Sequence, residues 1–156
     1  MMLLVRFHIF SLACSLALAS APAFAQEPIE LKGDVKVVRI AEQGGKRVET
    51  YAEPTQVVPG DRLKFTTSYR NGSGQAVQNF VITNPLPKAV VLTEVGNFEV
   101  SVDGGKSFGK LASRTVAIPE GGTRAATVAD VEQVRWTVAS IAPGASGSVT
   151  YFASVR

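Results

Sequence analysis

The chain has few of the residues that carry most enzyme chemistry. Its single cysteine (Cys14), its single histidine (His8) and both methionines lie near the start, and residues 26–156 contain none of the three types. That segment therefore has no disulfide, no thiol nucleophile, no imidazole base and few ligands for zinc, copper or haem. The composition predicts a protein that is not an enzyme, with no catalytic residue, no cofactor and no metal centre.

An excess of charge of one sign is also missing. The chain has 16 basic and 13 acidic residues, and Arg6 is the only charged residue among the first 25, which leaves 15 against 13 and a net charge of +2 for residues 26–156. Nucleic-acid-binding domains concentrate basic residues in a patch or stripe. A balance this small and dispersed predicts no nucleic-acid partner.

The chain has only one long apolar run, and it lies at the beginning. Arg6 precedes a nearly wholly apolar stretch over residues 7–19, and residues 21–25 (Ala-Pro-Ala-Phe-Ala) place small side chains at positions −3 and −1 before Gln26. This order is typical of a secretory signal, and the stretch is short for a membrane anchor. Competing interpretations are an uncleaved anchor helix or a lipid on Cys14.

We therefore expect residues 1–25 to be a cleaved signal peptide and residues 26–156 to be a single domain, exported to the periplasm or beyond the cell. No second apolar run approaches the length of a membrane span, so the mature chain is predicted to be soluble and to have no transmembrane segment.

The mature segment has the composition of a β-protein. It contains 20 Val, 11 Thr and 5 Ile against 5 Leu, and 14 Gly and 7 Pro interrupt it at short intervals. β-Branched side chains favour pleated strands, and no stretch free of Gly and Pro shows helical spacing of apolar residues. Short alternating runs between turn signals are typical of a sandwich or barrel.

The first such runs predict an N-terminal hairpin over residues 27–56, with strands at 34–40 and 47–52 around a glycine turn at 43–46. The apolar pattern changes phase between Val37 and Val38, which favours a β-bulge there.

The clearest alternation covers residues 62–70, and a strand over 76–83 follows it. We expect Asn84-Pro85-Leu86-Pro87 to end that strand, because proline lacks an N–H. The pattern also predicts strands at 89–94, 97–102, 107–111, 131–138 and 148–155. Residues 113–130 give no clear pattern.

Several of these segments, in order, resemble a known bacterial module. They are Pro59-Gly60-Asp61, the alternation to Tyr69, residues 71–87, Val134-Arg135-Trp136-Thr137-Val138 and Ile141-Ala142-Pro143-Gly144 with the final strand. The region 59–155 is similar to the conserved-repeat domain of unknown function number eleven of bacterial surface and envelope proteins. The resemblance implies an immunoglobulin-like fold and no enzymatic activity. With the strand pattern, it predicts an all-β, immunoglobulin-like antiparallel β-sandwich of about seven to nine strands.

Two hydrophobic positions carry specific expectations. Trp136 lies between Val134 and Val138 on one strand face, which predicts a core aromatic rather than a platform for sugar rings. Phe80 and Ile82 share a face that we assign to the core, so Val81 points outward. We expect the N-terminal hairpin to cover Val81; the alternative is that Val81 belongs to a contact surface.

Four carboxylates, Asp61, Asp103, Asp130 and Glu132, are placed to gather at loop ends, where a calcium ion could bind. Asp130 and Glu132 would share one face of a strand. Their spacing matches no compact calcium loop, and turn acids in solvent are the simpler interpretation.

Two short motifs invite chemical interpretations that the surrounding residues do not support. Ser107-Phe108-Gly109-Lys110 fits Ser-x-x-Lys, but it lies between glycines and lacks the partner motifs of penicillin-recognising enzymes. Asn71-Gly72-Ser73 fits a glycosylation acceptor and is most simply a turn.

The sequence thus predicts an exported, non-catalytic structural or protein-interaction module of the bacterial cell envelope. Its partner would be an envelope protein or a second copy, bound through an exposed strand edge. The alternative is a glycan- or calcium-binding β-sandwich module, which a glycan screen and a calcium-dependent melting temperature would detect.

Overall fold

The structure is a computed structural model that describes residues 29–156, so the predicted signal peptide lies outside the described residues. Ten strands and two short 3-10 helices make up the described chain: β1 (Ile29–Gln43), β2 (Lys46–Ala52), β3 (Arg62–Asn71), β4 (Val77–Pro85), β5 (Val90–Leu92), β6 (Glu99–Ser101), η1 (Leu111–Ser113), β7 (Thr115–Ala117), β8 (Thr123–Ala125), η2 (Val128–Asp130), β9 (Gln133–Ile141) and β10 (Ser146–Val155). Within residues 29–156 no helix has the length and apolar character needed to cross a membrane.

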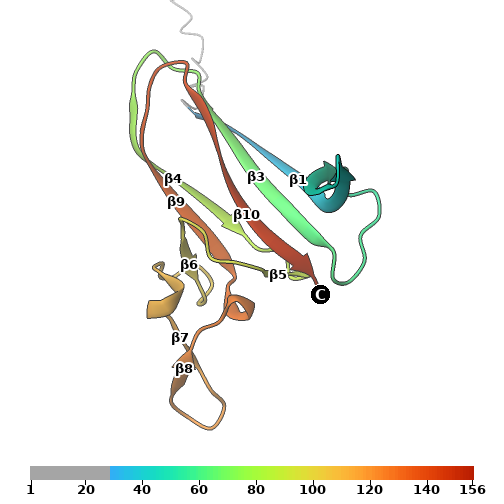
Figure 1. Cartoon of the computed structure of the whole chain (residues 1–156). Coiled ribbons are helices and arrows are strands. Elements are labelled where there is room, and N and C mark those ends of the chain that lie inside the picture. Colours follow the sequence, from blue (N-terminus) through green and yellow to red (C-terminus); the bar gives the residue numbers. More distant parts are fainter. Residues whose placement is uncertain (1–28) are drawn as a thin grey trace, which may run out of the picture.

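The strands form two packed sheets and a small ribbon, all antiparallel (Figure 1). One sheet has the order β2-β1-β3-β10-β5, the other has the order β4-β9-β6, and β7 pairs with β8 in a hairpin that projects from one end. This confirms the predicted all-β, immunoglobulin-like sandwich. The strand number rises to ten because residues 113–130, which gave no clear pattern, contain the β7–β8 hairpin.

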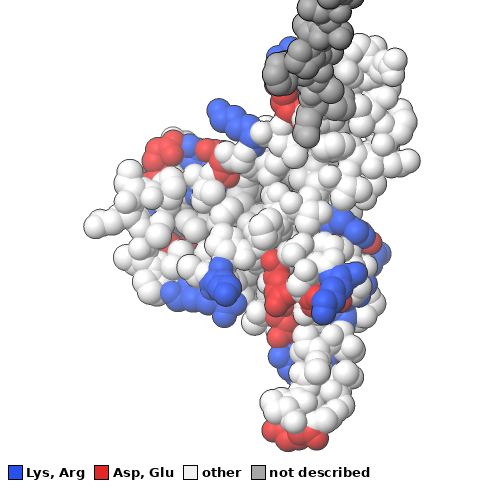
Figure 2. Space-filling model, turned by 180° about the vertical axis from the view of Figure 1, so that it is seen from behind, with Lys and Arg blue, Asp and Glu red and all other residues white. Residues whose placement is uncertain are grey.

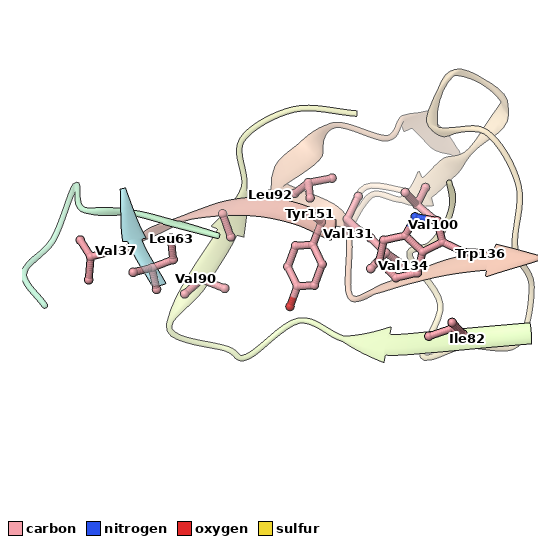
Figure 3. Packing of buried hydrophobic residues seen from close by; sticks show 11 residues of the cluster. Val37, Leu63, Ile82, Val90, Leu92, Val100, Val131, Val134, Trp136 and Tyr151 are labelled. Atoms are coloured by element: carbon pink, nitrogen blue, oxygen red, sulfur yellow. The ribbon is translucent and has the colours of Figure 1, made fainter. Parts of the chain in front are cut away.

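The core lies between the two sheets and is built from residues of both (Figure 3). Cross-strand neighbours Val37, Leu63, Ala153 and Leu92 form one inward row of the larger sheet. The smaller sheet contributes Trp136 and other apolar residues, so each strand buries alternate side chains as a sandwich requires.

The N-terminal hairpin forms around its predicted glycine turn, where Gly44 and Gly45 both have positive φ. Its first strand is longer than predicted, because β1 begins at Ile29 and pairs with β3 before it reaches β2. The predicted bulge is wrong. Both registers run without a break, and the change of phase arises because Val37 and Val38 are buried on opposite faces of β1.

Val81 points outward as predicted, but the expectation that the hairpin covers it is wrong. β1 joins the edge of the larger sheet beside β3, whereas Val81 lies on β4 of the smaller sheet and is 49% exposed. The hairpin packs by adding strands to the larger sheet. It does not cover the outer face of the smaller sheet. Ile82 is buried and Phe80 packs against the core, as assigned.

Strand β4 continues two residues further than its sequence suggested, to Pro85 instead of Thr83. Pro85 still opposes Gln133 in the ladder, and the next residue, Leu86, donates its N–H to the carbonyl of Glu132. Backbone groups point alternately to the two sides of a strand, so the missing N–H of Pro85 falls on the side away from β9. A proline is tolerated there because β4 is the edge of its sheet.

The predicted strand at 107–111 is wrong. Only Gly109 pairs there, through reciprocal backbone hydrogen bonds with Val100, and η1 follows directly. The glycine turn at 103–106 does reverse the chain, with positive φ at Gly104 and Gly105.

Candidate functional site

The carboxylates considered for calcium binding lie apart and are occupied by donors of the protein itself. Asp61 accepts from Arg39 Nη1 at 2.6 Å and from the backbone N–H of Val58. Asp130 closes η2, where it forms two 2.7 Å bonds with Arg124 and caps the helix through Thr127. An oxygen that already accepts from a guanidinium is a poor calcium ligand.

Asp103 and Glu132 lie closer together, on either side of the turn at Gly104. Asp103 accepts from the hydroxyls of Ser101 and Ser107, both within 2.7 Å, whereas Glu132 accepts from the N–H of Gly104. The expectation that Asp130 and Glu132 share a strand face is wrong, because Asp130 ends η2 and β9 begins only at Gln133. Within residues 29–156 no three His, Cys, Asp or Glu side chains cluster as metal ligands.

These contacts lower the pKa of three aspartates. The Arg39 guanidinium holds the pKa of Asp61 below its usual value of 3.8, and the Ser107 hydroxyl, with that of Ser101, does the same for Asp103. Arg124 and the backbone of Thr127 hold the pKa of Asp130 well below the same value. A carboxyl with a depressed folded pKa stabilises the fold above the unfolded pKa, and that stability is lost as the pH falls further.

We therefore expect the melting temperature to drop as the pH is lowered from about 4 towards 2. Asp130→Asn should lower the melting temperature at pH 7 and make the fall below pH 4 smaller, because the variant has no depressed carboxyl left to protonate at this site. Thermal melting across this pH range measures both effects. Glu120→Gln, at the exposed tip of the β7–β8 hairpin, is the control, and equal acid sensitivity of Asp130→Asn and wild type would contradict the assignment.

The two short motifs have structural roles. The Ser107 hydroxyl donates to Asp103 and accepts from Arg114 Nη1 at 2.8 Å, so it belongs to a polar network around the turn. The Asn71 side chain is fully buried, and its amide nitrogen donates to the carbonyls of Gln75 and Ile141. A fully buried amide that already bonds two carbonyls is no acceptor for a glycan.

Trp136 lies in the core, which confirms its prediction. It is 9% exposed, the Phe98 ring meets it edge-on at 5.4 Å and Tyr151 lies 6.3 Å away. A groove of about 900 Å³ runs past the pair and is also lined by Glu99 and Arg135. The indole lines this groove but presents no open ring face on which a sugar could stack.

The free edge of β1 is the feature that sequence reasoning did not locate. Strand β2 pairs only with residues 37–43 of β1, and β3 pairs with residues 29–37 on the other side. Residues 29–36 therefore lie at the border of the larger sheet, and Figure 1 shows no strand of the described chain along their outer side.

The hydrogen bonds of β3 define which backbone groups point outward at this edge. Asn71 donates to Ala145, and Val155 donates to Asp61, so the odd-numbered residues of β3 bond towards β10. The backbone groups of the even-numbered residues of β3 consequently bond towards β1. There they face even-numbered residues of β1, as Arg70 faces Glu30.

The odd-numbered residues of β1 therefore turn their N–H and C=O groups away from the sheet. These are Ile29, Leu31, Gly33 and Val35. The side chains of Ile29, Leu31 and Val35 lie on the core side, and Leu31 is 52% exposed because it sits at the border. Polar side chains fill the outer face, namely Glu30, Lys32, Asp34 and Lys36. The alternation of apolar and polar residues over 29–36 is visible in the sequence. Which edge of this strand stays unpaired depends on its pairing with β3.

The borders along β4 and β10 differ from this one, while β2, with seven residues, forms the remaining outer border of the larger sheet next to the β1 edge. Along β4, Asn79 has a positive φ of 51° and Pro85 has no N–H, so the edge is irregular. β5 pairs only with residues 153–155 of β10, which leaves an uncharged stretch at Ser146, Ser148 and Thr150. The β1 edge combines free backbone groups with ordered charges.

No family model matches this chain, and neither the curated proteins nor the solved structures contain a match to it. The resemblance of residues 59–155 to the conserved-repeat family therefore stays a prediction.

Proposed function

We propose that this protein is an exported, non-catalytic interaction module of the bacterial cell envelope that binds a protein partner by adding a strand to its larger sheet. The observation that carries the proposal is the free edge of β1. A row of unpaired backbone groups is a template for an extended segment of another chain.

The surface supports a protein partner rather than a polyanion. Basic and acidic side chains are interspersed over the face in Figure 2. Several charged side chains of the described chain are neutralised in ion pairs, such as Arg62 with Glu49 at 2.7 Å and Arg135 with Glu99 at 2.7 Å. A surface of this kind gives no long-range attraction for nucleic acid.

Export is the second part of the proposal and rests on residues 1–25. The secretory pattern ahead of Gln26 predicts that the protein acts outside the cytoplasm. A mature segment without cysteine is compatible with an oxidising compartment. Fractionation of the native host followed by intact-mass measurement should give an envelope species that matches residues 26–156.

Gly33 offers a matched pair of variants for testing the edge. Its N–H points outward, and a Cβ atom built on it meets no atom within 4 Å. Gly33→Pro therefore removes one edge donor and places a ring at the border without breaking a bond to β3, whereas Gly33→Ala keeps the donor.

Cross-linking in the envelope of the native host is the measurement. We expect the wild type and Gly33→Ala to give the same cross-linked species, and Gly33→Pro to lose most of it while melting within a few degrees of Gly33→Ala. Cross-links that persist in Gly33→Pro would show that the partner binds elsewhere. A cytoplasmic location of the full-length chain would contradict export.

A further inference from the structure

The free edge of β1 complements itself. On its outer face Glu30 and Lys32 carry opposite charges two residues apart. If a second copy is laid antiparallel along the edge with the two-fold axis at Leu31, Glu30 of each copy opposes Lys32 of the other. Leu31 then opposes Leu31 of the second copy. An isologous contact of this kind needs one surface only.

The backbone fits the same arrangement. With the axis at Leu31, odd residues oppose odd residues, so the outward groups of Ile29, Leu31 and Gly33 meet their counterparts in about six hydrogen bonds. The even residues oppose each other at the closer, non-hydrogen-bonded positions, with Cα atoms about 4.5 Å apart. The two ion pairs therefore form where cross-strand side chains are nearest.

A second register, with the two-fold axis at Gly33, also brings opposite charges together, but one of the lysines that it needs already has a partner within its own chain. It would set the second copy along Val35 and Lys36. Lys36 already bonds Glu53, and Pro54 lines a hollow with Gly33 and Val35. The Gly33 register would have to take Lys36 from Glu53 to set it against Glu30 of the second copy, whereas the Leu31 register uses Glu30 and Lys32, which form no ion pair within residues 29–156.

We infer that the occupant of the β1 edge is a second copy of this chain, paired antiparallel about Leu31, so that two five-stranded sheets become one continuous sheet. The inference rests on the proposed function and names its partner. It also gives a role to the half-exposed Leu31, which is covered by its counterpart.

Charge exchange tests the pairing. Within residues 29–156 neither Glu30 nor Lys32 takes part in an ion pair, so substitutions there break none, although Glu30→Lys sets its new charge opposite Arg70 of β3. In a homodimer of Glu30→Lys, the new lysine of each copy would oppose Lys32 of the other copy. In a homodimer of Lys32→Glu, the new glutamate of each copy would oppose Glu30 of the other copy. Each homodimer would therefore contain two like-charge pairs. Each single variant should weaken the dimer about tenfold or more.

Mixing the two single variants restores both ion pairs in a heterodimer, and so does the double exchange Glu30→Lys with Lys32→Glu in a homodimer. The measurement is sedimentation equilibrium of the mature protein, with Glu120→Lys as a control that adds the same charge far from the edge. We expect the 1:1 mixture and the double variant to associate like the wild type, and all variants to melt within a few degrees of it, since the lysine opposite Arg70 costs little at an exposed position.

Three results would overturn the inference. One is a wild type that stays monomeric up to about 1 mM, beyond the range of ordinary weak interfaces. Another is single variants that associate like the wild type, as pairing through the β10 edge would give. The third is a mixture that fails to regain association, as the Gly33 register would give. If the wild type is monomeric but Gly33→Pro still loses its envelope cross-links, the second copy is excluded and the proposed function stands. If Gly33→Pro changes nothing either, both fail.

Discussion

Trp136→Ala is expected to lower the free energy of unfolding by about 3–5 kcal/mol, as truncation of a buried aromatic does elsewhere. The side chain is 9% exposed and stands opposite Ile82 of β4 in the smaller sheet. It also reaches across to the larger sheet, where Tyr151 lies 6.3 Å away and stacks in turn on Phe65 at 4.7 Å. Removal of the indole therefore opens a cavity at the contact between the sheets.

Denaturant unfolding monitored by far-UV circular dichroism measures this loss, because the variant has no tryptophan fluorescence. Trp136→Phe should recover more than half of it, since a phenyl ring fills much of the space. Val81→Lys is the matched surface control and should change stability by less than about 0.5 kcal/mol. A loss below about 1 kcal/mol for Trp136→Ala would mean that the indole is not part of the core.

The sequence predicted those parts of the fold that depend on a residue's own neighbours. Alternation over residues 62–70 predicted β3, and the paired glycines at 44–45 predicted the first turn. Trp136 was assigned to the core because a period of two fixes its face together with Val134. Each of these inferences needed only the local chain.

Pairing between distant strands was beyond the sequence. The sequence of residues 29–36 does not show whether they pair with β3 or pack on the surface around Val81. That outcome depends on which sheet border is left unpaired by the other strands. Pro85 was misjudged for the same reason, since a missing N–H matters only if a strand lies on that side. The free edge of β1 could be located only after β3 had been identified as its partner.

Short segments failed for a different reason. Residues 107–111 were predicted as a strand because they follow a hairpin turn, yet only Gly109 reaches a partner before η1 begins. A segment of two or three residues is too short for its periodicity to distinguish an isolated bridge from a strand. β7 and β8, with three residues each, were missed for this reason.

Asn71 shows how a residue that looks like a turn former can hold two sheets together. It ends β3 in the larger sheet, and its side chain reaches the carbonyl of Ile141 at the end of β9 in the smaller one, at 2.9 Å. Its oxygen accepts from the N–H and the hydroxyl of Ser73, and its backbone bonds Ala145 and Gly144 of the β9–β10 turn.

Asn71→Asp is expected to destabilise the fold by about 3 kcal/mol or more at pH 7, because a buried carboxylate would face two carbonyl oxygens and supply no donor to either. The substitution keeps the size of the side chain and the acceptor for Ser73, so packing is hardly altered. Burial beside carbonyl oxygens raises the folded pKa of the new carboxyl above its unfolded value. The protonated acid can again donate one bond, so the loss should shrink as the pH falls from 7 towards about 5.

Chemical denaturation of Asn71→Asp at pH 7 and pH 5 tests this, with Asn97→Asp as the exposed control, which should change stability by less than about 0.5 kcal/mol at both pH values. Asn71→Leu adds a second comparison: it also leaves the two carbonyls unpaired but has no charge to neutralise, so its loss of about 3 kcal/mol should be the same at both pH values. If Asn71→Asp were as stable as the wild type, the amide would not be the link between the sheets. A loss equal at the two pH values would mean that the missing donors, rather than the buried charge, account for all of it.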